Sequence, residues 1–331
     1  MAKYADHLPL YRQSGIYARE GVDLERSTLA DWVGRSVALL DPLIEALRKD
    51  VLASDVLHGD DTPVPVLAPG LGKTKTGRLW TYVRDGRPWG SDHPPAAVFF
   101  YSSDRKGIHP QAHLKGFKGT LHADGYAGFN AIFETGAVTE AACWAHVRRK
   151  FFDVHVATGS PLAREAFDQI AALYVIEAQI KAKPPDERRR LRQEQTVPLT
   201  TDLKAWLEAT LQKISGKSEL AKAMRYALSR WPALCCYLND GRVEIDNNAA
   251  ERSIRGIALG RKNYLFAGSD TGGNRAAAIY SLIETCKLND IDPEAYFRDI
   301  LGRIAEHKIN RITELLPWNW KKHQASAKTE P

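Results

Sequence analysis

In the stretch Val56-Leu57-His58-Gly59-Asp60-Asp61-Thr62, a short run typical of a β-strand ends in two acidic residues. Asp124 closes a second such run, and Glu251 lies where the pattern predicts the first turn of a helix. Carboxylates brought to one point by separate elements suit Mg²⁺, which prefers oxygen ligands and acts on phosphate groups. The three positions therefore raise the hypothesis of a metal site that cleaves nucleic acid.

Each of these acidic residues also has a purely structural explanation. Asp60 and Asp61 precede Thr62-Pro63, and Asp124-Gly125 is a common turn dipeptide. Glu251 at the start of a helix would interact favourably with the helix dipole. Periodicity leaves open whether Asp60 or Asp61 would bind a metal.

Residues 54–145 have the pattern of a β-sheet. Turns rich in Gly, Pro and Lys separate the first three strands, which suits antiparallel hairpins, and helices are expected at 107–117 and 126–134. Strands are expected at 55–67, 78–85, 96–102, 119–124 and 138–144. Three hairpin strands followed by alternating helix and strand predict a mixed α/β sheet.

Helical segments are expected on both sides of this region. Residues 1–53 fit either a helix-turn-helix or a helical lead-in that packs on the next domain, with a new helix beginning at Asp41-Pro42. The other expected segments are an inserted helical subdomain at 146–240, a last core helix within 241–268, a C-terminal helical segment at 269–320 and a disordered tail at 321–331.

The composition is that of an ordinary soluble protein, with 44% hydrophobic and 26% charged residues among 331. No apolar stretch approaches the roughly 20 residues that span a bilayer, and the N-terminus lacks the apolar core of a signal peptide. We therefore expect a cytoplasmic location and no membrane partner. The four cysteines include no Cys-x-x-Cys pair, which argues against a structural zinc finger and for reduced thiols.

A net charge of +6 is compatible with a polyanionic partner but does not establish one. The arginine run at 188–192 is expected to be a solvated helix face or loop. Lys262 would share a helix face with Glu251 only if Gly260 does not break the helix. The candidates for DNA backbone contact are Arg148, Arg149, Arg255, Arg261 and Lys262, and ion pairing with nearby acids is their alternative role.

Six blocks of local sequence are distinctive. They are Asp6–Gln13, His58–Val64, Ala123–Phe129, Cys143–Phe151, Asn247–Arg252 and Gly260–Tyr264. With these blocks in this order, the chain resembles the transposases of the insertion sequence 66 family, and the resemblance runs from Tyr4 to about Trp320. That family belongs to the Asp-Asp-Glu (DDE) group, whose catalytic core is ribonuclease-H-like.

The resemblance implies a ribonuclease-H-like fold, with a five-stranded mixed sheet, flanking helices and a helical insertion. It assigns Asp60, Asp124 and Glu251 as catalytic residues and as ligands of Mg²⁺, for which Mn²⁺ would substitute. It also implies DNA hydrolysis at a transposon end, followed by attack of the 3′-hydroxyl on target DNA. The expected partners are transposon ends, target DNA, further copies of the chain on paired ends and accessory proteins of the element.

Members of that family carry further sequence upstream, including a cysteine-bearing, zinc-binding region, and this chain begins after it. An alternative hypothesis is therefore a truncated, catalytically silent DNA-binding remnant that regulates transposition. A third is a ribonuclease-H-like nuclease unrelated to transposition. Loss of a carboxylate would favour the remnant, and none is lost; activity without transposon ends would favour the nuclease.

Overall fold

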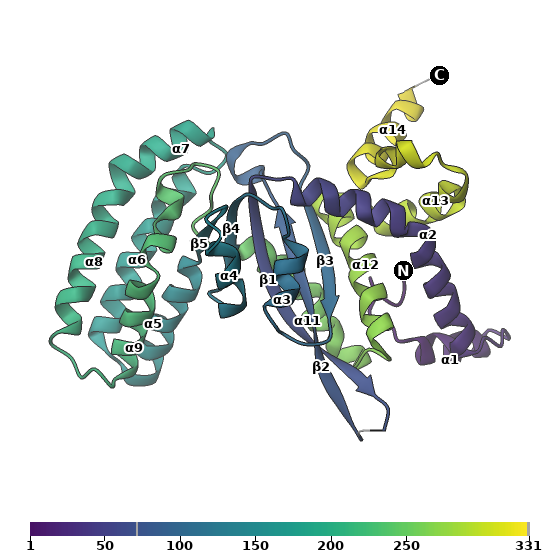
Figure 1. The fold of residues 1–331 in the computed structure, drawn as a ribbon, viewed down its shortest axis with the longest axis horizontal. Coiled ribbons are helices and arrows are strands. Elements are labelled where there is room, and N and C mark those ends of the chain that lie inside the picture. Colours follow the sequence, from purple (N-terminus) through teal and green to yellow (C-terminus); the bar gives the residue numbers. More distant parts are fainter. Residues whose placement is uncertain (71, 330–331) are drawn as a thin grey trace.

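A five-stranded mixed sheet forms the centre of the molecule in the computed structural model, which describes residues 1–70 and 72–329 (Figure 1). The strands are β1 (Val56–Ala68), β2 (Lys73–Arg84), β3 (Ala96–Ser102), β4 (Gly119–Ala123) and β5 (Val138–Ala142), in the spatial order β3-β2-β1-β4-β5. The first three pair antiparallel, whereas β4 pairs parallel with both β1 and β5. The expected mixed α/β sheet is confirmed.

Helix α12 (Asp270–Leu288) covers the edge strand β3 (Figure 1). The hydroxyl of Ser281 accepts from the Phe99 N–H at 2.8 Å, and that of Thr285 accepts from the Ala97 N–H at 3.1 Å. These bonds satisfy backbone groups that an edge strand would otherwise leave open to pairing with another chain. Ser269 caps α12 by accepting from the Gly272 N–H, so the Gly-rich stretch at 268–273 forms largely the first turn of this helix.

Helices also lie on both faces of the sheet. Helix α11 (Asn248–Tyr264) packs on β1 and β2, while α3 (Ile108–His113) and the short α4 (Asn130–Phe133) belong to the opposite side. On that opposite side, the buried ring of Trp80 contacts His113 and Phe129.

The N-terminal segment forms α1 (Leu10–Arg19) and α2 (Arg26–Leu52). The predicted helix start at Asp41-Pro42 is wrong, because α2 is one helix of 27 residues with Pro42 inside it. An internal proline costs about 3 kcal/mol. The buried face of α2, which includes Leu40, Leu43 and Leu47, continues on the same side of the helix before and after Pro42. Burial of this face offsets the cost of the proline. Helix α2 packs on α12 and β3, as the lead-in interpretation expects.

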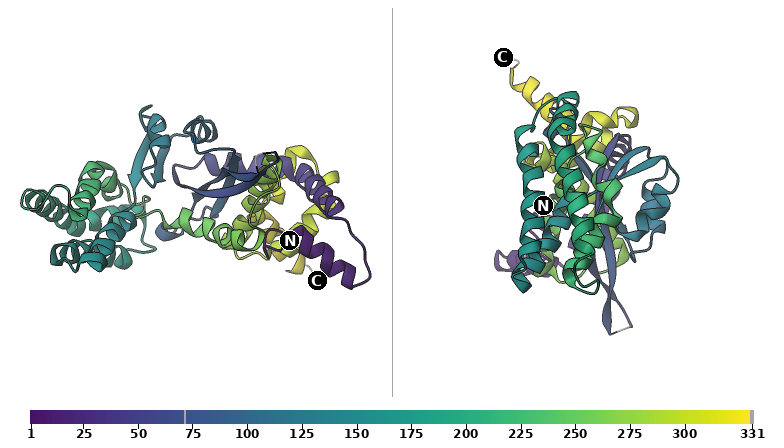
Figure 2. Two further views of the ribbon diagram at one scale, coloured as in Figure 1. Left: turned by 90° about the horizontal axis from the view of Figure 1, so that it is seen from below. Right: turned by 90° about the vertical axis from the view of Figure 1, so that its left-hand side faces the viewer.

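The helical insertion lies at one end of the molecule (Figures 1 and 2) and has its own hydrophobic core, which includes Phe151, Ile170 and Leu207. Its helices are α5 (Trp144–Thr158), α6 (Pro161–Gln179), α7 (Pro185–Leu191), α8 (Val197–Leu211), α9 (Glu219–Ser229) and α10 (Trp231–Leu234). A single turn of π-helix at 192–196 joins α7 to α8.

The arginine run at 188–192 is not a solvated face as a whole, and that prediction is corrected. Arg188 and Arg192 are one helical turn apart and 1% and 0% exposed. Arg192 pairs with Glu177 at 2.7 Å and donates to three backbone carbonyls at 237, 240 and 243. Arg188 pairs with Glu244 at 2.6 Å. These contacts tie the insertion to the segment that leads into α11.

The C-terminal segment consists of α13 (Pro293–Arg303) and α14 (Pro317–Thr329). The predicted disordered tail is therefore wrong as far as Thr329, and its last residues, 330–331, lie outside the described residues. Trp320 donates to Asp299 at 2.7 Å, which joins α14 to α13. No helix in the described ranges combines the length and hydrophobicity needed to cross a bilayer.

Candidate active site

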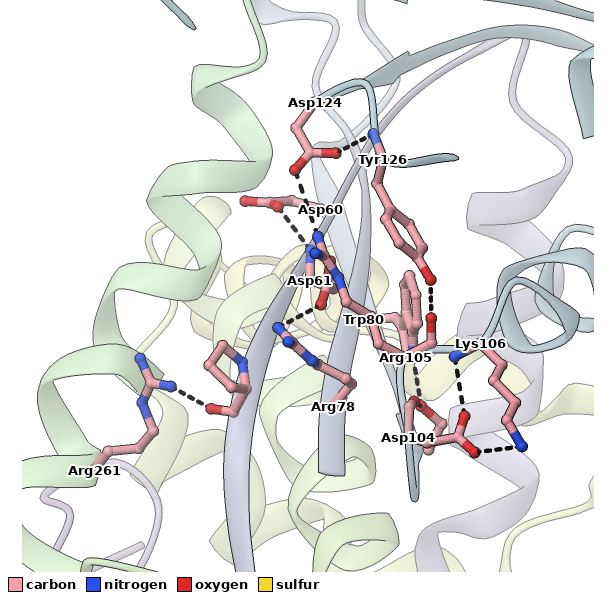
Figure 3. Close-up of polar contacts among 12 residues, drawn as sticks. Asp60, Asp61, Arg78, Trp80, Asp104, Arg105, Lys106, Asp124, Tyr126 and Arg261 are labelled. Carbon is pink, nitrogen blue, oxygen red and sulfur yellow. Dashed lines mark hydrogen bonds and ion pairs between the residues drawn. The ribbon is translucent and has the colours of Figure 1, made fainter. Parts of the chain in front are cut away.

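The alternation of β1 sends its two adjacent aspartates to opposite faces of the sheet. Asp60 shares a face with His58, which contacts Asn247 at the start of α11. Asp61 points to the other face, where Arg78 binds its carboxylate at 3.0 Å and Arg105 binds it at 2.8 Å (Figure 3). The Asp61 side chain is 1% exposed. The structure therefore gives Asp61 a structural ion-pair role and directs Asp60 toward α11.

Asp124 lies beside Asp60 because β1 and β4 run parallel. His58 and His122 are opposite each other in the register and stack with ring centroids 4.4 Å apart. Asp60 lies two residues after His58, and Asp124 lies two residues after His122, so the two aspartates lie side by side toward the same end of these strands (Figure 3). Asp124 accepts from the Tyr126 N–H at 3.0 Å, and its other oxygen lies 3.7 Å from Arg105.

Glu251 comes from the first turn of α11, as expected. Asn247 anchors this helix start, since its side chain donates to the Gly59 carbonyl at 2.8 Å and its backbone N–H donates to Cys143 Sγ at 3.3 Å. One carboxylate oxygen of Glu251, Oε1, is buried and accepts no hydrogen bond from a described residue. His146 Nε2 lies 3.6 Å from that oxygen.

The electrostatics indicate that the three carboxylates face one region. Burial raises the pKa of Asp60 to about 7, and the charges of Asp124, Asp61 and Glu251 raise it too, against a hydrogen bond from the Asp61 backbone. A half-buried group of like charges is a costly arrangement that a cation would relieve. The three carboxylates supply oxygen donors, which fit Mg²⁺ or Mn²⁺.

Among the described residues, the potential metal-ligand atoms that cluster tightly are not those of the three carboxylates together. Cys143, His146 and Glu251 offer atoms within 4.8 Å of one another, whereas Asp60 and Asp124 do not join them at that spacing. Burial raises the pKa of Cys143 to about 12, and its Sγ already accepts a hydrogen bond from the Asn247 backbone N–H. Cys143 and His146 therefore fit a supporting role around Glu251 better than a separate thiolate site.

The structure leaves some of the predicted DNA-binding residues exposed and gives others a contact within the protein. Helix α11 continues through Gly260 to Tyr264, so Arg255 and Lys262, about one and three turns after Glu251, lie on its face and are both exposed. Arg261 instead donates to the Pro63 carbonyl, which gives it a structural contact. Arg148 and Arg149 lie on α5 in the insertion. The guanidinium of Arg148 stacks on Phe167 at 4.2 Å, and Arg149 is exposed.

Sequence reasoning missed Arg105, His146 and Asn247 as residues of this site. Arg105 stands between Asp61 and Asp124 and stacks on Tyr126 at 4.1 Å. No spacing rule connects Arg105 with β1 and β4, because the sheet alone brings them together. His146 and Cys143 are three residues apart at the start of α5, and this one-turn spacing is the signal in the sequence that pointed to them.

Comparisons with known proteins agree with this architecture. The family model described as "Transposase IS66 family" matches residues 1–275, and the "IS66 C-terminal element" matches residues 281–318. Three curated relatives from Sinorhizobium fredii (strain NBRC 101917 / NGR234) are the uncharacterized proteins y4hP, y4qI and y4jD. They are 46%, 40% and 39% identical over 98%, 97% and 98% of this chain.

The chain spans 61% of the length of the first two relatives and 65% of the third. The family match itself covers most of the chain, including β1, β4 and α11, which carry the three carboxylates. The chain therefore belongs to the IS66 family of transposases.

Proposed function

We propose that this chain is the catalytic core of a DNA transposase that uses Asp60, Asp124 and Glu251 to hold divalent metal ions. The observation that carries the proposal is the half-buried Asp60 beside the charges of Asp124 and Glu251, delivered by β1, the end of β4 and α11. Mg²⁺ would bind there, and Mn²⁺ would substitute. When bound, such ions activate an attacking water or 3′-hydroxyl and neutralise charge on the departing oxygen.

The side chains around the triad have distinct parts in this proposal. Asp60 occupies the middle position, with Asp124 on the neighbouring strand end and Glu251 on α11. Arg105, already 3.7 Å from Asp124, would hold a non-bridging oxygen of the scissile phosphate or balance the charge of the aspartates. Arg255 and Lys262 would bind phosphates further along the strand, where exposed cations contribute affinity without reading sequence.

The proposed reaction sequence is hydrolysis at the element's end, followed by in-line attack of the released 3′-hydroxyl on target DNA. Its partners would be the two transposon ends, the target DNA and a second copy of the chain on the paired ends. We also propose that accessory proteins of the element take part and that the chain acts in the cytoplasm.

The test is metal-dependent nicking of labelled DNA that contains the element's terminal sequence. The chain should nick this DNA in Mg²⁺ or Mn²⁺ and not in EDTA, and Glu251→Gln should abolish nicking. Glu208→Gln is a matched control because Glu208 is exposed on α8, where its ion pair with Lys204 spans 3.9 Å. Binding without nicking by the unaltered chain would instead support the silent DNA-binding remnant. Nicking of unrelated DNA at the same rate would support a general nuclease.

A further inference from the structure

Two cavities meet where the helical insertion approaches the start of α11. One has a volume of about 410 Å³ and the other about 350 Å³, and both are lined by Tyr174, Asp246 and Asn248. We call these two adjoining cavities together the junction groove. Asn248 is one turn before Glu251 on α11, and Ala145, which also lines the groove, is next to His146. The groove therefore begins beside the proposed catalytic carboxylate.

The first cavity offers aromatic faces together with guanidinium groups. Phe152 is 47% exposed and packs against Phe167 with ring centroids 5.6 Å apart. Arg148 lies over the rings of Phe167 and Tyr174, at 4.2 and 6.0 Å. The exposed ring face of Phe152 suits stacking of a flat aromatic group. Arg149 is exposed here and forms no ion pair with any described residue.

The second cavity contains acids and bases, but most of its acids are already neutralised. Asp85 pairs with Arg87 at 2.6 Å, and Glu244 pairs with Arg188 at 2.6 Å. Glu177 is bound by Arg192 at 2.7 Å.

Two exposed cations, Lys181 and Arg252, also line this cavity, and neither forms an ion pair within the described part of the chain. The remaining acid, Asp246, accepts hydrogen bonds from the backbone and side chain of Asn248. Once the paired acids are set aside, Lys181 and Arg252 outnumber Asp246, so the net charge of the cavity is positive.

The volumes match a small ligand or single nucleotide units, since such sites usually measure about 300–1,000 Å³. They do not match a DNA duplex, which would have to lie across the surface. Aromatic faces followed by unpaired cations along one path are the combination that binds bases by stacking and phosphates by charge.

We propose that the junction groove binds unpaired nucleotides of a DNA strand next to the cleavage site, with a base stacked at Phe152 and phosphates held by Arg149, Arg252 and Lys181. The proposal rests on the proposed function, because it takes the strand to be the one that enters the carboxylate site. It adds a preference for unpaired DNA that a carboxylate triad alone does not have.

Fluorescence anisotropy of the full chain in EDTA tests this preference without any cleavage. Two probes share one duplex sequence: the first is blunt, and the second ends in an unpaired tail that carries 2-aminopurine. The tailed probe should bind more tightly and its 2-aminopurine signal should be quenched by stacking. Phe152→Leu keeps an apolar side chain but removes the ring, and it should weaken tail binding about fivefold or more and reduce quenching.

Arg252→Gln should weaken binding of the tailed probe more than that of the blunt probe. Lys217→Ala is the matched control, since Lys217 is exposed at the far end of the insertion and outside both cavities, and binding should not change. Thermal unfolding of each variant checks that the fold is kept.

Equal affinity for the two probes, or equal weakening of both by Phe152→Leu, would overturn the proposal. A tail preference in a chain that never nicks DNA would refute the proposed catalysis and leave the groove intact.

Discussion

At the scale of single residues, the alternation of side chains along β1 places two neighbouring aspartates on opposite faces of the sheet. Asp60 faces α11 and two other carboxylates, whereas Asp61 is buried against Arg78 and Arg105. The two aspartates should therefore respond differently to the same substitution.

We expect Asp60→Asn to abolish metal-dependent nicking while leaving the free energy of unfolding unchanged or increased, because it removes a buried charge that has like-charged neighbours. Asp61→Asn should lower the free energy of unfolding by about 3 kcal/mol, because it breaks a buried pairing and leaves two guanidinium groups undercompensated. Urea denaturation at pH 7.5 without metal, together with the nicking assay, compares the two variants. Full activity in Asp60→Asn would contradict the assignment of Asp60.

His146 provides a second prediction at this scale. Its ring lies 3.6 Å from the buried oxygen of Glu251, a position from which it would orient that carboxylate. Substitution of groups that hold metal ligands typically lowers metal affinity about 10- to 100-fold, and we expect this range for His146→Gln. Calorimetric titration with Mn²⁺ measures the affinity, with His93→Gln as the control because His93 is exposed in the β2–β3 connection. An unchanged affinity would limit His146 to a structural role.

At the scale of elements, α11 is positioned by contacts from three parts of the chain. Asn247 binds the strand β1 through Gly59 and the start of α5 through Cys143. Arg188 and Arg192 hold the segment before α11 against the insertion. The insertion therefore supports the helix that carries Glu251.

We expect Arg192→Met to lower the free energy of unfolding by about 3–5 kcal/mol, because Glu177 and three carbonyls would lose their buried partner. Arg190→Ala should change it by less than about 0.5 kcal/mol, since the pair that Arg190 forms with Glu194 is exposed on both sides. Chemical denaturation followed by circular dichroism measures both. Equal effects would show that the buried network contributes little.

At the scale of the whole molecule, the helical insertion lies at one end and the N- and C-terminal helices pack at the other (Figures 1 and 2). Asp60, Asp124 and Glu251 come from β1, the end of β4 and the start of α11, and the segment before α11 is held to the insertion. The site therefore joins two hydrophobic clusters, one around the sheet and one in the insertion. A ligand that binds there would stabilise both.

We expect Mg²⁺ to raise the melting temperature of the chain, because an ion that binds only the folded state adds about 2.7 kcal/mol at one hundred times its dissociation constant. Glu251→Gln should reduce this shift. Differential scanning fluorimetry in MgCl₂, compared with KCl at the same ionic strength, separates specific binding from screening. An equal shift in both salts would argue against a metal site in the folded chain.

The sequence by itself determined the strands, most helices and the family, because these depend on local patterns. The alternation and turn residues of 54–145 predicted all five strands, four of them to within about two residues, whereas β2 begins at Lys73, five residues before its expected start at 78. Local patterns failed where burial outweighed them. Pro42 sits inside a helix and Arg188 and Arg192 lie in a core because their neighbours in space compensate for the cost.

The family resemblance implied the triad, but only the tertiary structure shows which acidic side chains lie near one another. Asp60 and Asp61 are equivalent in a linear pattern, and the parallel pairing of β1 with β4 selects Asp60 as the neighbour of Asp124. The contributions of Arg105 and His146, and the junction groove, likewise depend on segments far apart in the chain that meet through packing. Periodicity reports which face a residue occupies, but only the folded chain brings two faces together.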